Sequence, residues 1–231
     1  MRARAAVDRL AGLPALKLRP HDVVAVTALR GARASAALSG VDVTEDELKS
    51  GTAFDDPATG PVARGAVRLS TELGLVARVW GAAPLQALAR LHVVAAADSG
   101  DIEKLGRPAT ANAAARLEQL ADALIRPSRA PAIVIAAIVH AEVLATDAFG
   151  TWSGLVARAA SRCVLMQRGL DSGGVVAPEV GHLELGLTEY QIAIAGYGSG
   201  TPEGVAGWVA HCARALEIGA GDALRVCAQI R

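Results

Sequence analysis

The stretch at residues 140–171, HAEVLATDAFGTWSGLVARAASRCVLMQRGLD, decides the fold. The apolar run before it is too short to span a bilayer and ends in His140 and Glu142, which predicts a buried helix over 130–146. A second helix resumes after the loop DAFGTWSG at 147–154. A loop in this place points free backbone N–H groups and a helix dipole into one small space, which suits a phosphate. Thr151 or Ser153 could cap the helix there instead, so both interpretations stay open.

Composition favours one all-α domain. The 231 residues suffice for a single sizeable core, and no linker-like stretch divides them, so we predict one domain over 1–231. Aromatic residues make up only 3% of the chain, and Ala, Leu, Val and Arg dominate it. This bias favours helix by intrinsic propensity and leaves little material for strands.

Charge and cysteine usage exclude several classes of partner. The 23 basic and 23 acidic residues balance, so no global field attracts nucleic acid or an anionic membrane. The N-terminal stretch carries Asp8 and Arg9 where a signal peptide needs apolar residues. Cys163, Cys212 and Cys227 form no CxxC pair, which predicts reduced, buried thiols and no metal site. We therefore expect a cytoplasmic protein without membrane or nucleic-acid contacts.

Apolar spacing near 3.6 residues, together with Pro, Gly and capping residues, predicts the individual helices. They are expected at 2–12, 22–38, 61–80, 84–97, 111–126, 130–146, 152–169, 185–195 and 203–229. Thr44 and Glu47 form a capping-box pattern that starts a further short helix. The polar segment 97–112 is expected to form an exposed flap. This divides the chain into N-terminal helices (1–60), a core (84–172) with the loop 147–158, and C-terminal helices (173–231).

The loop resembles the signature of the Fic (Fido) family, HPFx(D/E)GNGRxxR, which also joins a buried helix to the next one. On DAFGTWSGLVAR, residues 147–158, the signature is matched by Phe149, Gly154 and Arg158. The remaining signature residues His, Pro, Asp/Glu, first Gly, Asn and first Arg are replaced by Asp147, Ala148, Thr151, Trp152, Ser153 and Leu155. His140, seven residues before the catalytic position, extends the resemblance.

A second segment resembles the inhibitory helix of many Fic proteins, (S/T)xxxE(G/N). Ser35 and Gly40 are in register, and Ser39 stands where the family has Glu. In the family this Glu pairs with the second signature Arg, here Arg158, and keeps nucleotide from binding productively. The resemblance covers about residues 20–172, and PEGVAGWVAHCARALEIG, residues 202–219, looks like the helix that closes such domains.

The resemblance implies a chemistry whose groups are replaced here. Fic enzymes transfer AMP, or another phosphate-linked group, to a hydroxyl, with the signature His as general base. The carboxylate of Asp147 is only a weak base at neutral pH. Thr151 has no charge for holding Mg²⁺, and Leu155 lacks the guanidinium that would pair with phosphate. Trp152 carries a side chain where a Gly would let amides approach the ligand.

We therefore predict a Fic-like pseudoenzyme that acts by binding or regulation, with a protein partner or as a homodimer, and without cofactor or metal. The degenerate phosphate loop would comprise Thr151, Trp152, Ser153, Gly154, Leu155 and Arg158. The alternative is an active Fic-type transferase of altered chemistry that uses ATP and Mg²⁺ to modify a protein or small-molecule hydroxyl. There Asp147 would act as base and Arg158 as phosphate anchor.

Three structural expectations accompany this hypothesis. Phe149 should be buried and anchor the loop. Trp152 or Leu155 should project into the place where a phosphate would lie. Asp147 should pair with the buried Arg158, because a buried charge needs a partner. The remaining histidines of interest are expected to be core residues with no chemical role: His92, His182 and His211.

Overall fold

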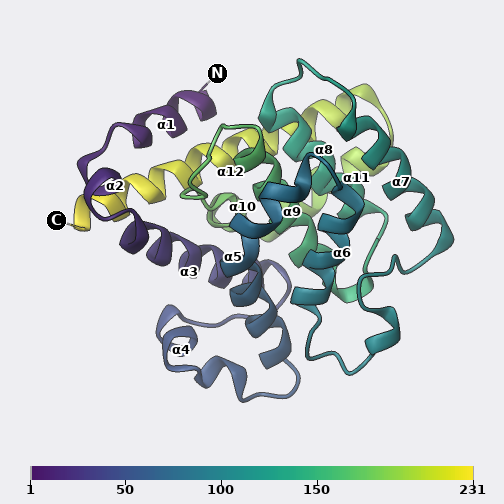
Figure 1. Ribbon diagram of the computed structural model, residues 1–231, viewed down its shortest axis with the longest axis horizontal. Coiled ribbons are helices and arrows are strands. Elements are labelled where there is room, and N and C mark those ends of the chain that lie inside the picture. The colour runs from purple at the N-terminus through teal and green to yellow at the C-terminus, as the bar shows by residue number, and fades with distance from the viewer. Residues whose placement is uncertain (1, 231) are drawn as a thin grey trace.

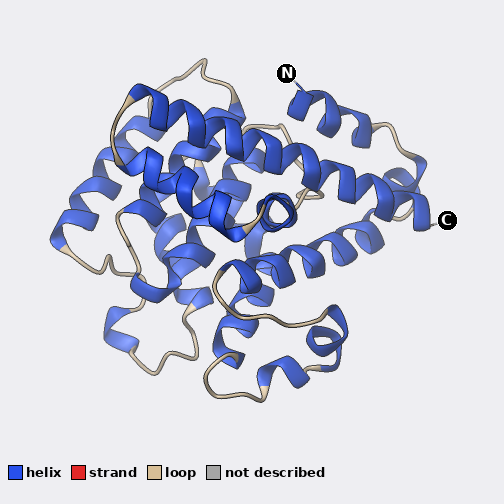
Figure 2. Ribbon diagram, turned by 180° about the vertical axis from the view of Figure 1, so that it is seen from behind, coloured by secondary structure: helices blue, strands red, loops and turns tan. Residues whose placement is uncertain are grey.

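The computed structural model describes residues 2–230, and all regular secondary structure in that range is helical (Figures 1 and 2). The α-helices are α1 Arg2–Ala11, α2 Pro14–Leu18, α3 Pro20–Leu38, α4 Glu45–Ser50, α5 Gly60–Trp80, α6 Pro84–Ala95, α7 Ala111–Ile125, α8 Ala132–Ala145, α9 Ser153–Gln167, α10 Pro178–Leu185, α11 Leu187–Gly198 and α12 Pro202–Gln229. The short 3₁₀ helices are η1 Thr52–Phe54, η2 Ile102–Lys104 and η3 Gly150–Trp152. The all-α prediction is confirmed.

The helices pack around α8 and α9, which contact each other extensively. The helix α5 lies against α6 and α9, while α3 contacts both α5 and α10. The long helix α12 crosses the whole molecule and packs against α1, α10 and α11 (Figure 1). Most of α8 is buried, in keeping with a sequence that is apolar except at His140 and Glu142. This arrangement brings the C-terminus of α3 close to the N-terminus of α9, although about 115 residues separate them.

Capping residues set several helix boundaries as the sequence predicts. The Thr44 side chain accepts from the Glu47 N–H while the Glu47 carboxylate accepts from the Thr44 N–H, a complete capping box. Thr201 caps α12 by accepting from the Gly204 N–H, with Pro202 in the first turn. The three cysteines are free and buried, as expected.

Two features differ from the predicted elements. The helices α2 and α10 were not predicted from the sequence, whereas the helix expected at 185–195 corresponds to α11. Gly186 separates α10 from α11, and its φ of 99° is one that only glycine adopts without strain. The proposed flap is an irregular loop, largely exposed, that contains η2. Its end is fixed by a hydrogen bond of 2.8 Å from the Ala109 N–H to the Ala148 carbonyl.

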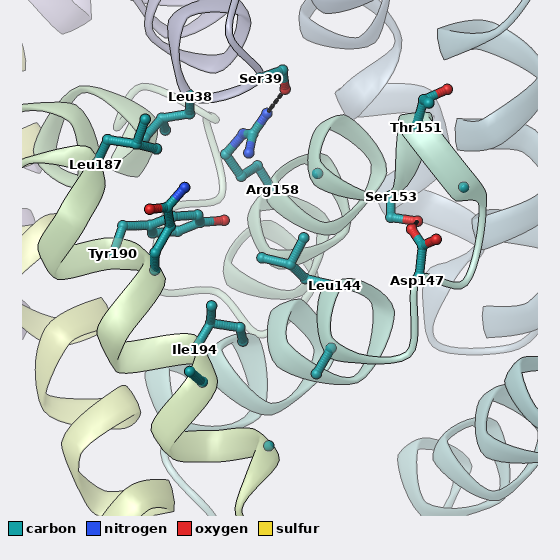
Figure 3. Close-up of a pocket in the computed structure, with 16 residues that line it drawn as sticks. Leu38, Ser39, Leu144, Asp147, Thr151, Ser153, Arg158, Leu187, Tyr190 and Ile194 are labelled. Carbon is teal, nitrogen blue, oxygen red and sulfur yellow. Dashed lines mark hydrogen bonds between the residues drawn. The ribbon is translucent and has the colours of Figure 1, made fainter.

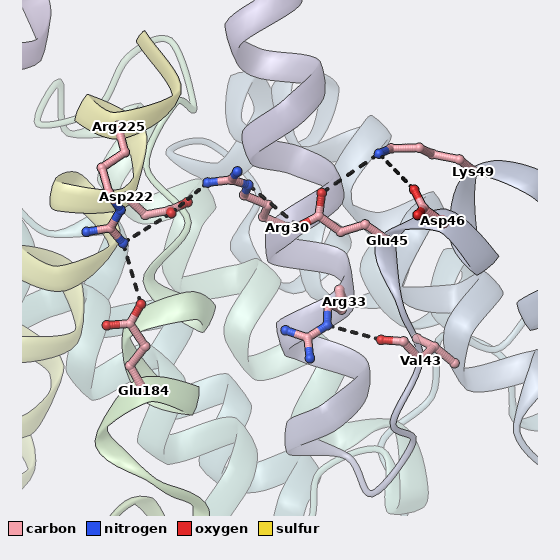
Figure 4. A network of polar contacts seen from close by, with 9 residues as sticks. All are labelled: Arg30, Arg33, Val43, Glu45, Asp46, Lys49, Glu184, Asp222 and Arg225. Carbon is pink, nitrogen blue, oxygen red and sulfur yellow. Dashed lines mark hydrogen bonds and ion pairs between the residues drawn. The ribbon is translucent and has the colours of Figure 1, made fainter. Parts of the chain in front are cut away.

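A polar network holds α3 in place from two sides (Figure 4). Arg30 donates from Nη1 to Asp222 of α12 at 2.8 Å, and its Nε lies 3.6 Å from Glu45 of α4. Arg33 donates to the Val43 carbonyl at 3.1 Å. These contacts fix the rotation of α3 about its axis, and therefore determine which of its residues face α9.

Within residues 2–230, no helix combines the length and apolar character needed to cross a bilayer.

Candidate functional site

The loop between α8 and α9 begins with a tight helix termination. The Asp147 N–H donates to the Leu144 carbonyl and the Ala148 N–H donates to the Val143 carbonyl, which is a Schellman motif. This motif needs a left-handed residue after the cap, and Asp147 supplies it with φ of 47°. Asp tolerates this conformation better than most side chains other than Gly. The position therefore fixes the start of the loop.

Asp147 is an exposed residue whose carboxylate is bound inside the loop. Ser153 donates from Oγ to Asp147 Oδ1 at 3.0 Å and accepts from the Phe149 N–H at 2.8 Å. Figure 3 shows the Ser153 and Asp147 side chains facing each other at one side of the pocket. The three residues thus form a local network that closes the loop onto the first turn of α9.

Phe149 anchors the loop to the core, as predicted. It is 4% exposed, and its ring centroid lies 4.6 Å from that of His92. The His92 ring is itself a core group, since its Nδ1 accepts from the Gly106 N–H and burial lowers its pKa. The anchor therefore joins the loop to both α6 and the flap.

Arg158 is buried on the second turn of α9 and is bound by α3. It donates from Nε to Ser35 Oγ at 2.8 Å and from Nη2 to the Ser35 carbonyl at 2.8 Å. A further bond of 2.6 Å joins Nη2 to Ser39 Oγ (Figure 3). The predicted pair between Asp147 and Arg158 is wrong, because within residues 2–230 no ion pair joins them. Arg158 is instead bound by Ser35 and Ser39 of α3, and Asp147 is bound by Ser153.

The end of α3 presents these serines by its own termination. Gly40 has φ of 83°, its N–H donates to the Ala37 carbonyl, and the Val41 N–H donates to the Ala36 carbonyl. This is a second Schellman motif, with Ser39 as the C-cap. Resemblance to the inhibitory helix implies that position 39 faces Arg158, and Ser39 does so. The Ser35 side chain lies one turn earlier on the same face.

A cavity of about 510 Å³, called here the loop pocket, opens above the loop. It is lined by Leu38, Ser39, Leu144, Ala145, Asp147, Gly150, Thr151, Ser153, Gly154, Arg158, Leu187, Tyr190, Gln191, Ile194, Ala195 and Gly198. One wall is apolar and comes from α11 and the end of α8, whereas the opposite wall is the polar loop (Figure 3). Arg158 and Asp147 are its only charged lining residues.

The prediction that Trp152 or Leu155 fills this space is wrong. Leu155 is 1% exposed and packs into the core, because its place on α9 faces inward. Trp152 lines a different cavity, the flap pocket of about 520 Å³ between the loop and the flap. Gly150 and Thr151 line both pockets. The loop pocket is therefore open to a ligand.

The donor set of the loop pocket does not fit Mg²⁺. This cation prefers several oxygen ligands, including one or two carboxylates in near-octahedral geometry. Asp147 offers the only carboxylate in the lining, and Ser153 already donates to it. Thr151, at the position of the acidic signature residue, contributes only a neutral hydroxyl.

The sequence analysis missed Tyr190 as a site residue. It lies on α11, lines the loop pocket, and has its hydroxyl 2.7 Å from His140 Nε2. Burial raises the pKa of the Tyr190 hydroxyl, so the side chain is a neutral hydrogen-bonding group at pH 7. No local pattern marks Tyr190, because its neighbours in the site come from other helices.

Comparison with solved structures identifies the architecture. Fic-1 from C. elegans superposes with a TM-score of 0.77 at 16% identity, covering 98% of this chain and 71% of that one. A Fic family protein from Desulfovibrio desulfuricans G20 gives a TM-score of 0.76 at 15% identity, covering 96% and 73%. The chain has a Fic fold. No family model matches the sequence, and no curated protein matches it either.

The loop pocket lies beside the loop that resembles the Fic signature. The resemblance puts the signature loop between the buried helix and the next one, and here the loop joins α8 to α9 under the pocket. Identity of 16% or less carries the fold and leaves the activity open. The function must therefore be inferred from the residues of the pocket.

Proposed function

We propose that this Fic-fold protein is a binding protein without AMP transfer, and that its loop pocket holds a ligand with an apolar body and one anionic group. The apolar wall includes Leu38, Leu187 and Ile194, which match an apolar body. Arg158 is the only cation in the lining and would face the anionic group. Its bonds to α3 use Nε and Nη2, and the guanidinium also interacts with the Tyr190 hydroxyl, so the ligand would meet Arg158 where it lines the pocket.

The observation that carries this proposal is the engagement of both charged groups in structural bonds. Arg158 is held by two serines of α3, and the Asp147 carboxylate is held by Ser153. A general base has to be free to accept a proton from the substrate. Here the only carboxylate of the loop, that of Asp147, accepts through Oδ1 a hydrogen bond that closes the loop, so its use as a base would compete with that closure.

Charge balance also argues against a nucleoside triphosphate. Its several negative charges would meet one guanidinium and one opposing carboxylate, in a lining whose donor set does not fit Mg²⁺. Phosphoryl and nucleotidyl transfer depend on metal ions and cations that neutralise the developing charge. A ligand with a single negative charge matches Arg158 better.

One observation favours the alternative, an active transferase of altered chemistry. The loop pocket is open and Trp152 is turned into the flap pocket, so the side chain does not exclude a phosphate. Asp147 lies at the pocket and is exposed to solvent. Under this hypothesis Asp147 would release its bond to Ser153 and act as the base.

Calorimetry separates the two. We expect medium-chain alkyl carboxylates and alkyl monophosphates to bind, and ATP with Mg²⁺ to show no binding. Arg158→Gln should abolish alkyl carboxylate binding, whereas Arg90→Gln, on a surface ion pair far from the pocket, should leave it unchanged. Failure of every amphiphilic anion to bind the unmodified protein would refute the proposed ligand class.

Radiolabelled ATP tests the chemistry directly. Incubation with Mg²⁺ and a cell extract should label neither this protein nor any other. Transfer of label by the unmodified protein, lost in Asp147→Ala, would replace the binding-protein proposal with the transferase.

A further inference from the structure

A second group of chemically active side chains lies behind the wall of the loop pocket. Three of the five histidines in the chain meet there with Cys212, although they come from α8, α10 and α12. One potential ligand atom each from His140, His182 and Cys212 lies within 4.8 Å of the others, and all three residues are buried. Trp208 and Tyr190 enclose them in a small apolar cluster.

The histidines of this cluster are in the state that metal binding requires. Burial lowers the pKa of His140 and His182 well below 6.5, so both rings are neutral and carry a free lone pair. Two imidazole nitrogens and one sulfur are a donor set typical of zinc. Burial raises the pKa of the Cys212 thiol, so a cation would have to displace its proton on binding.

The orientation of His182 is fixed by a second layer of groups. Its Nδ1 lies 3.0 Å from His211 Nε2, and His211 Nδ1 lies 3.5 Å from Glu189 Oε1. No hydrogen bond joins His211 Nδ1 to Glu189 at this distance, but the negative charge of the carboxylate still favours a proton on His211 Nδ1, and His211 Nε2 would then accept from His182 Nδ1. This leaves His182 Nε2 without a proton. Carboxylate-supported histidine chains of this kind orient ligands in zinc sites.

We propose that His140, His182 and Cys212 form a buried Zn²⁺ site, completed by the Tyr190 oxygen. Tyr190 lies 2.7 Å from His140 Nε2 and also lines the loop pocket, which provides the path of entry. Tetrahedral zinc holds its ligand atoms about 3.3–3.8 Å apart, so small side-chain rotations close the cluster around the ion. His211 acts as a positioning residue.

Charge balance completes the site. Binding breaks the S–H bond of Cys212 and the O–H bond of Tyr190, and both protons leave to solvent through the loop pocket. The two negative charges then match the two positive charges of Zn²⁺, so the metal and its ligands together are neutral beside the positive charge of Arg158. The sequence analysis expected no metal, because ligands at positions 140, 182 and 212 share no short spacing.

Cobalt provides the probe for the ligands. Metal-free protein titrated with Co²⁺ should bind one equivalent and develop a thiolate-to-cobalt charge-transfer band with the visible bands of tetrahedral cobalt. Cys212→Ala should lose the charge-transfer band. Cys227→Ala is the matched control, because Cys227 is also a free, buried cysteine of α12, and it should keep the band. Tyr190→Phe should keep the band and release one proton fewer.

Zinc affinity tests the positioning residue. His211→Gln should keep the charge-transfer band while weakening Zn²⁺ binding about 10–100-fold, since the change removes support of a ligand and not the ligand itself. Zn²⁺ should raise the melting temperature of the unmodified protein and of Cys227→Ala, but not of Cys212→Ala. Absence of stoichiometric Zn²⁺ binding, or a charge-transfer band that survives Cys212→Ala, would overturn the proposal.

Discussion

Arg158 and Ser35 lie 123 positions apart in the sequence and are joined by two hydrogen bonds of 2.8 Å, one to the Ser35 hydroxyl and one to its carbonyl. The guanidinium thereby donates to a carbonyl in the last turn of α3, and Arg158 is only 2% exposed. The serines are neutral acceptors, whereas a Glu at position 39, as in the inhibitory helix that this segment resembles, would form an ion pair with Arg158. Arg158 is therefore hydrogen-bonded by neutral acceptors, while the buried carboxylate of Glu179 interacts with its charge at longer range.

Ser35→Ala should lower the free energy of unfolding by about 1.5–3 kcal/mol, because it removes one acceptor of a buried charged group. The measurement is urea denaturation followed by circular dichroism. Ser70→Ala is the control, since Ser70 bonds only a carbonyl of its own helix and its loss should stay within about 0.5 kcal/mol. Equal effects of the two substitutions would contradict the role given to Ser35.

Ser39→Glu should place a carboxylate against Arg158 at the pocket, because Ser39 Oγ is 2.6 Å from Nη2. The new carboxylate would compete with any anionic ligand, so alkyl carboxylate affinity should fall at least tenfold in calorimetry. Labelling from ATP should remain absent in both proteins. Unchanged carboxylate affinity would mean that the ligand does not use Arg158.

Leu155→Arg, which restores a family signature residue, should destabilise the protein by about 3 kcal/mol or more. Leu155 is 1% exposed, so the substitution buries a charge without a partner. Thr151→Asp is the control, because Thr151 is exposed and its change should stay within about 0.5 kcal/mol. Thermal and urea unfolding measure both. A stable Leu155→Arg protein would show that α9 can rotate and turn position 155 out of the core towards the loop pocket.

Gly181→Ala should be strongly destabilising, since a Cβ there would lie 2.0 Å from the Ala215 carbonyl oxygen, where α10 packs on α12. Gly207→Ala, in an exposed and open position of α12, should instead stabilise the protein by about 0.4–1 kcal/mol. Melting temperatures of the two variants should therefore move in opposite directions. A tolerated Gly181→Ala would contradict the close approach of these helices.

Metal-free protein should lose stability as the pH falls below about 6.5. The pKa of His182 is lowered well below that value by burial, with further contributions from His140, His211 and Arg158. The unfolded chain then takes up a proton that the folded chain refuses, so stability present above pH 6.5 is lost at up to about 1.4 kcal/mol per pH unit for each such group. His182→Gln should reduce the slope measured by urea denaturation at several pH values. His21→Gln, an exposed position, should not change it.

The helices were predictable where local signals are strong. Thr44 and Thr201 mark the starts of α4 and α12, because the side chain of each threonine caps the helix by accepting from the N–H group three residues later. The helix α10 was missed, because its eight residues, PEVGHLEL, lack the apolar spacing of an amphipathic helix. Its formation depends on packing against α12.

The candidate site was predictable in position but not in its contacts. The burial of Phe149 was predicted correctly, since it is the apolar member of the loop, whereas the roles given to the other loop residues stay predictions. The partner of Arg158 was wrong, because it depends on the packing of α3 on α9, which no local pattern encodes. Tyr190 and the histidine cluster were not predicted either, because their residues come together only through the packing of separate helices.

The two pockets share a partition that is only one loop thick. Gly150 and Thr151 face both cavities, and the Ala109 N–H ties the flap to the Ala148 carbonyl at the edge of this partition. A molecule on one side therefore rests against the same two residues as a molecule on the other side. A shift of the partition that enlarges one chamber should narrow its neighbour, so we expect a molecule in one chamber to change the affinity of the other.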